Sequence, residues 1–201
     1  MTFRSHPYPP PGHQVRLPTP IWTAALDEVR RYSHLGGTRD HPGSEGLVYL
    51  AGVPAAAGLV VTAVLRLQHE PQGDRVAPTR EEVRWLMSTL RDRDEKLVAQ
   101  FHTHRNGAFH SPGDDQMATS FHDGFLSIVA PKFAVGIHRL DQCEVHEYRK
   151  GYFYAMTTAE VESRITVHDI VVDRLPEMLQ KEPDRWHRFV QRLNSIALRQ
   201  R

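Results

Sequence analysis

LVAQFHTHRNGAFHSPGDD, residues 97–115, is the stretch that decides how this chain is interpreted. Its first five residues are mostly apolar, as in a buried strand, and they run directly into His102, Thr103 and His104. In a strand, residues two apart point to the same face, so the two imidazoles can bind one ion together. A random chain with the same 13 histidines would also contain about one such pair, so the pair alone fits two solvated side chains equally well.

The loop that follows the histidines offers a third ligand. Ser111 stands three residues before Asp114, at the expected start of a short helix, and the carboxylate there can reach back to the histidines. Zinc takes nitrogen and oxygen ligands in tetrahedral geometry, and three protein ligands leave a fourth position for water, as catalytic sites require. A structural zinc would take a fourth protein ligand, usually a thiolate, and the only cysteine is the distant Cys143.

Hydrolysis at such a site also needs a base that deprotonates or orients the water. Glu45 is the candidate, because it follows a Gly-rich loop and directly precedes the apolar run 47–51, where a carboxylate can lie at the edge of a sheet. The other interpretation of Glu45 is a solvated loop side chain, since most glutamates are surface charges.

Outward from this stretch, the hydrophobic patterns predict an alternation of helices and strands. Apolar spacing predicts helices over 21–33 and 79–91, the second with Thr79 and Glu82 as a capping box. A last helix is expected over 184–199. The alternation of these helices with the strands given next indicates an α/β or α+β domain with a mixed sheet flanked by helices. Strands are expected over residues 47–51, 59–67, 97–101, 125–130, 134–140 and 143–148.

Length and composition limit the class of protein. With 201 residues, 40% of them hydrophobic, the chain can form one domain with a sizeable core. A net charge of +1 argues against a surface built to bind nucleic acid or acidic lipid. The chain has neither the apolar run of about 18 residues that spans a membrane nor an apolar signal sequence, so we expect a cytoplasmic protein. A single cysteine excludes a disulfide scaffold.

Taken together, these residues resemble the JAMM (MPN+) motif of the JAB-domain, Mov34-type zinc metalloproteases: Glu45, then His102-Thr103-His104, then Ser111-Pro112-Gly113-Asp114. The strands around the motif are also similar to that family, and the resemblance covers about residues 20–150. It implies a single cytidine-deaminase-like MPN domain with a mixed, curved sheet. We expect a Pro-rich N-terminal arm over 1–20, extended or disordered, the catalytic domain over 21–155, and a C-terminal helical extension over 156–201.

The resemblance also implies a role for each residue of the motif. Zinc would be bound by His102, His104 and Asp114. Glu45 would act as the general base and then as the acid that protonates the leaving amine, and Ser111 would donate a hydrogen bond to the oxyanion. The loop before the serine is one residue shorter than is usual in the family. The usual histidine-to-aspartate spacing would therefore select Asp115, whereas the S-x-x-D pattern selects Asp114.

The chain looks like a compact, stand-alone bacterial JAB protein of the type found in ubiquitin-like conjugation operons. The expected function is that of a zinc isopeptidase that cleaves after the C-terminal tail of a ubiquitin-like protein, by deconjugation or precursor processing. Its expected partners are that modifier and E1-like and E2-like enzymes. The alternatives are a peptidase that processes a sulphur-carrier protein and a non-catalytic MPN-like scaffold. A metallo-β-lactamase-like nuclease is disfavoured, because Asn106 and Gly107 stand where its motif needs Asp and His.

The remaining histidines are expected to be background. We expect His110 to be an exposed loop residue, and no pattern pairs the others into a second site. Cys143 is expected to be a small packing residue. Ordinary positions around the sheet are expected for His122, His138 and His146.

Overall fold

The computed structural model describes residues 14–32, 43–56, 58–67, 78–120, 122–169 and 177–180. Its strands are β1 (Val15–Pro18), β2 (Leu47–Ala55), β3 (Gly58–Arg66), β4 (Lys96–Thr103), β5 (Leu126–Ala130), β6 (Glu144–Arg149), β7 (Tyr152–Ala155), β8 (Ile165–His168) and β9 (Glu177–Gln180). Its helices are α1 (Thr19–Tyr32), α2 (Arg80–Asp92), α3 (Pro112–Met117) and α4 (Thr158–Arg164), with short 3-10 helices η1 (Lys132–Ala134) and η2 (Leu140–Gln142).

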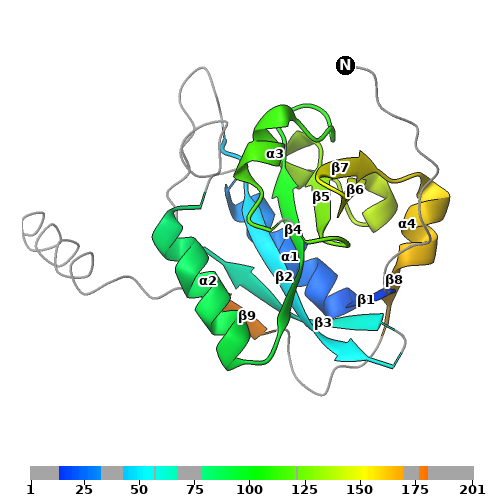
Figure 1. Cartoon of the computed structure of the whole chain (residues 1–201). Helices are drawn as coiled ribbons and strands as arrows, with labels where there is room; N and C mark the ends of the chain where they lie inside the picture. Colours follow the sequence, from blue (N-terminus) through cyan, green and yellow to red (C-terminus); the bar gives the residue numbers. More distant parts are fainter. Residues whose placement is uncertain are drawn as a thin grey trace, which may run out of the picture.

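These strands form one curved, mixed sheet in the order β7-β6-β5-β4-β2-β3-β1-β8 (Figure 1). β9 also pairs with β3, beyond the part of β3 that pairs with β1. β4 lies inside the sheet, antiparallel to β2 and parallel to β5. The expected α+β fold with a mixed, curved sheet flanked by helices is confirmed.

Each face of the sheet is covered by a helix. Successive residues of a strand point to opposite faces, so a single strand contributes side chains to both cores. In β2, Val48 and Leu50 pack into the hydrophobic cluster that α1 closes with Trp22 and its neighbours. Tyr49, between them, belongs to the second cluster, which α2 closes with Leu86 and Leu90. The sheet therefore has a core on both faces.

The predicted capping box of α2 is confirmed. The Thr79 side chain accepts a hydrogen bond from the Glu82 amide at 3.2 Å, and the Glu82 carboxylate accepts one from the Thr79 amide at 2.8 Å. These bonds satisfy two groups that otherwise have no partner at the start of a helix.

The structure corrects the expectation for the end of the Pro-rich arm. Residues 15–18 form β1, which lies between β3 and β8, and α1 begins at Thr19. Val15 and Leu17 alternate with an exposed residue and are buried, as in any strand with one face on a core. Pro18 stands at the end of the strand and Pro20 in the first turn of the helix, where a missing N–H is tolerated. Residues 1–13 lie outside the described ranges.

The strand expected over 134–140 is wrong. That segment consists of the end of η1, a turn with Gly136 at φ 75°, and the start of η2. Its carbonyl groups bond to helix α1 instead of a neighbouring strand. Arg30 donates to the Ala134 carbonyl at 3.1 Å, and the Trp22 indole donates to the His138 carbonyl at 2.9 Å.

The sheet continues past residue 155, where the catalytic domain was expected to end. β8 pairs in parallel with β1, with Val15 opposite Ile165, and β9 pairs with β3. Residues 156–168 are thus part of the sheet domain and not the start of a separate extension. The helix expected over 184–199 lies outside the described residues. Among the residues that the structure describes, no helix has the length and apolar character needed to cross a membrane.

Candidate metal centre

The two histidines of the H-x-H pattern lie at the end of a strand that is paired on both sides. His102 stands opposite Leu47 of β2 and Val129 of β5. The His104 amide continues the pairing by donating to the Ala130 carbonyl at 2.9 Å. Both imidazoles are therefore carried by a backbone with little freedom to move, and both are buried.

Asp114 is positioned by the start of helix α3. The Ser111 hydroxyl accepts a hydrogen bond from the Asp114 amide at 3.2 Å, and the Ser111 amide donates to Asp114 Oδ2 at 2.6 Å. This is a capping box in which an aspartate takes the place of the usual glutamate or glutamine. The S-x-x-D pattern thus fixes the direction of the carboxylate by local hydrogen bonds.

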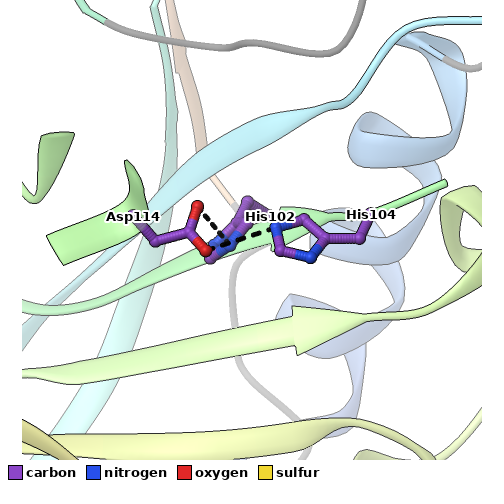
Figure 2. Close-up of side chains that lie close together, drawn as sticks. All are labelled: His102, His104 and Asp114. Atoms are coloured by element: carbon purple, nitrogen blue, oxygen red, sulfur yellow. Dashed lines mark ion pairs between the residues drawn. The ribbon is translucent and has the colours of Figure 1, made fainter. Parts of the chain in front are cut away.

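His102, His104 and Asp114 come together as a buried group whose ligand atoms all lie within 4.8 Å of one another (Figure 2). The His102 Nε2 atom lies 3.4 Å from Asp114 Oδ1, and His104 Nε2 lies 3.4 Å from Asp114 Oδ2. Two atoms bound to one tetrahedral ion at about 2.0–2.1 Å would lie roughly 3.3–3.4 Å apart. The separations therefore fit a shared metal ion.

Unsatisfied polar atoms support the same conclusion. Neither ring nitrogen of His102 has a hydrogen-bond partner in the described part of the chain, although both are buried. Buried polar atoms nearly always have a partner, and a metal ion held with Asp114 would supply one for His102 Nε2. The donor set of two imidazoles and one carboxylate fits a metal of the zinc type.

The charges at the site favour a cation. Burial alone raises the pKa of Asp114, but the facing His102 and His104 hold it well below its usual range. Burial lowers the pKa of His104, and the opposing effect of Asp114, with smaller contributions from Glu45 and Glu144, raises it overall. The carboxylate is therefore ionised at neutral pH and presents its negative charge to the two imidazoles.

Glu45, the candidate base, stands two residues before the start of β2 and is half-buried. Its charge helps to raise the pKa of His104, so the carboxylate lies within electrostatic range of the cluster. It is not one of the three grouped ligands. Its catalytic role stays a prediction.

Asp115, the alternative ligand, points elsewhere. Its side chain is 57% exposed and its Oδ1 atom lies 3.3 Å from His110 Nδ1. Burial, followed by the neighbouring charge of Asp114, raises the pKa of Asp115. The structure thus groups Asp114, and not Asp115, with the two histidines.

Two histidines that the sequence left as background lie beside the cluster. The expectation of an exposed His110 is wrong: its side chain is 4% exposed, and its ring centre lies 4.8 Å from that of His146. Burial is the main cause that lowers the pKa of His110 to about 3 and the pKa of His146 to about 4, so both rings are uncharged at neutral pH. No local pattern links these positions. His146 lies on β6 opposite Ser127 of β5, whereas His110 lies in the loop before α3, so only the tertiary fold brings them together.

Fold and site together define an α+β protein with a buried group of two histidines and one aspartate that could hold a metal ion. No family model matches the chain. The probable metalloprotease y4jG of Sinorhizobium fredii is 33% identical to it, in an alignment that covers 49% of this chain and 68% of that protein. The chain belongs to the family of this metalloprotease.

Among solved structures, the solution structure of protein DSY2949 from Desulfitobacterium hafniense superposes with a TM-score of 0.54. The match covers 82% of this chain and 99% of that chain, at 14% sequence identity. At this identity the likeness shows the fold alone.

Proposed function

We propose that this protein is a zinc-dependent peptidase or isopeptidase that cleaves after the C-terminal tail of a ubiquitin-like protein. The observation that carries the proposal is the buried group of His102, His104 and Asp114, with both Nε2-to-carboxylate separations at 3.4 Å. Membership of a metalloprotease family supports hydrolysis of a peptide-type bond. The resemblance to the JAMM motif supports zinc as the metal and a ubiquitin-like tail as the substrate.

The residues around the cluster have distinct proposed roles. Zinc bound by His102, His104 and Asp114 would lower the pKa of a bound water and polarise the scissile carbonyl. The Glu45 carboxylate takes a proton from the attacking water and returns it to the nitrogen of the leaving amine. The Ser111 oxygen already accepts the Asp114 amide hydrogen, so its own hydroxyl hydrogen can be donated to the carbonyl oxygen as charge develops there. One such donor is worth about 3–4 kcal/mol of barrier.

The surface beside the cluster suits a peptide. Phe109 is 58% exposed, and its ring stands edge-on to His104 with 5.3 Å between the ring centres. An extended, flexible tail can lie on such an aromatic ring while its last peptide bond reaches the metal. A net charge of +1 gives no support to binding of nucleic acid. The proposed partners are the modifier, its conjugates, and E1-like and E2-like enzymes of the same operon.

The test is cleavage of a ubiquitin-like protein fused through its C-terminus to a reporter, with zinc content measured on the same samples. Glu45→Gln should keep the zinc of the wild type and lose about 100-fold or more in cleavage rate. The matched control is Glu162→Gln, which changes an exposed glutamate of α4 and should cleave at the wild-type rate.

Two results would overturn the proposal: wild-type cleavage by Glu45→Gln, or full activity after zinc has been removed with a chelator. Cleavage of a sulphur-carrier protein alone would replace the proposed substrate. A protein that binds no zinc and cleaves nothing would be a scaffold.

A further inference from the structure

The buried pair of His110 and His146 resembles the pair in the candidate metal centre. The ring centres of His110 and His146 are 4.8 Å apart with an interplanar angle of 43°. Those of His102 and His104, which face one carboxylate, are 5.0 Å apart with an angle of 58°. The second pair is thus spaced like the first and lies beside it, with 6.2 Å between the ring centres of His102 and His110.

A carboxylate oxygen faces one nitrogen of each ring and favours the proton there. His110 Nδ1 lies 3.3 Å from Asp115 Oδ1, and His146 Nε2 lies 3.6 Å from Glu144 Oε1. A neutral imidazole places its hydrogen on the nitrogen that faces a carboxylate, so the lone pairs belong to the opposite nitrogens. These are His110 Nε2 and His146 Nδ1.

Both of these nitrogens are buried and, within the described residues, have no hydrogen-bond partner. A histidine that binds a metal typically has one nitrogen on the ion and the other donating to a carboxylate or carbonyl. Each ring of this pair has a carboxylate facing one nitrogen and no hydrogen-bond partner on the other. The two rings, with centres 4.8 Å apart, thus offer two buried nitrogens that are available to bind one ion.

We propose that His110 and His146 form a second, accessory site for a divalent transition-metal ion, through His110 Nε2 and His146 Nδ1. Imidazole ligands favour Zn²⁺, Ni²⁺ or Cu²⁺ over Mg²⁺ and Ca²⁺. The carboxylates of Asp115 and Glu144, one behind each ring, offset the charge of the ion. The site has two protein ligands and no directly bound carboxylate, so it binds more weakly than the candidate metal centre and fills after it.

The experiment measures zinc binding to the full chain by equilibrium dialysis with elemental analysis, over a range of free Zn²⁺. The wild type should bind one ion tightly and a second more weakly. His146→Gln and His110→Gln should each abolish the second and leave the first. His122→Gln, which changes an exposed histidine, is the matched control and should bind as the wild type does.

A second pair of variants leaves both rings in place. Asp115→Asn and Glu144→Gln should each weaken the second ion by about 10-fold, within the usual range for carboxylates that support a ligand histidine. If the wild type saturates at one zinc ion, the proposed accessory site is overturned. The same holds if His146→Gln still binds two ions.

Asp114→Asn separates this inference from the proposed function. It should lose the first ion and keep the second. Failure of the accessory site therefore appears as a missing second ion in a protein that still cleaves, whereas failure of the proposed function appears as missing cleavage.

Discussion

At the scale of single residues, the Asp114 carboxylate takes part in both the candidate metal centre and the start of a helix. Its Oδ2 atom accepts the Ser111 amide at 2.6 Å, and the same atom lies 3.4 Å from His104 Nε2. The hydrogen bond to the backbone orients the carboxylate before any ion binds. A preoriented ligand loses little conformational freedom on binding, so the affinity of the site depends strongly on this one side chain.

We therefore expect Asp114→Asn to weaken the tighter zinc ion by about 100-fold or more, beyond the range typical of residues that only support a ligand. Asp115→Asn should leave that ion unchanged, because the Asp115 side chain lies outside the cluster. Competition with a chromogenic zinc chelator measures both variants. Equal losses in the two would contradict the choice of Asp114.

The Cys143 thiol is a reactive group that its surroundings make inert, whereas the surroundings of Asp114 keep its carboxylate ionised. Burial raises the pKa of Cys143 to about 12. At pH 8 the fraction of thiolate should be about 1,000-fold lower than for a thiol of pKa 9. We expect very slow reaction with Ellman's reagent in the native protein and fast reaction in urea. A fast native reaction would show that the thiol is accessible.

At the scale of elements, short hydrogen-bonding patterns could be predicted from the sequence and turns that depend on distant partners could not. Thr79 and Glu82 mark the start of α2, and the S-x-x-D pattern marks the start of α3, because a capping box involves only four consecutive residues. The apolar run 134–140 looks like a strand, yet its carbonyls accept hydrogen bonds from Arg30 and Trp22 of α1.

The histidines of the site also fall into those that a local pattern predicts and those that only distant contacts bring together. The candidate ligands His102, His104 and Asp114 follow from a local motif, and the structure groups them. His110 and His146 are 36 positions apart, one in the loop before α3 and the other in β6, so no motif of the sequence could show that they are neighbours.

A buried ion pair connects strand β6 to helix α4. Glu147 is fully buried, and Arg164, 2% exposed, donates to it at 3.1 Å. Arg149 donates to the same carboxylate at 3.1 Å. Glu147→Gln should lower the free energy of unfolding by about 3–5 kcal/mol, because the buried Arg164 charge loses its partner.

Urea denaturation followed by circular dichroism measures this loss. The control is Asp141→Asn, which breaks the exposed pair with Arg139 and should not shift the midpoint measurably. Equal midpoints for Glu147→Gln and the wild type would show that the buried pair does not stabilise the fold.

At the scale of the whole molecule, the sheet is completed by strands from both ends of the described chain. β1 lies between β3, an early strand, and β8, a late one. Both β1 and β8 are only four residues long. Such short strands depend on their neighbours for stability, so the sequence near residue 15 could not reveal a strand without knowledge of residues 165–168.

A chain that ends at residue 155 should consequently fail to unfold cooperatively. It lacks β8, the partner of β1, and Arg164, the partner of Glu147. A chain that ends at residue 180 retains every described strand and is the control. Thermal melts of the two chains compare how cooperatively they unfold. A sharp transition for the shorter chain would show that residues 21–155 form an independent domain.

The parallel pairing of β1 with β8 also has a consequence for synthesis of the protein on the ribosome. Val15 leaves the ribosome 150 residues ahead of its partner Ile165. At the usual 5–20 residues per second, β1 waits roughly 8–30 s for that neighbour. During this interval one side of the nascent sheet has unpaired backbone groups, while β2, β5 and β4, which ends in His102, are already made. The nascent chain is therefore expected to depend on chaperones late in translation, after the residues of the candidate metal centre have emerged.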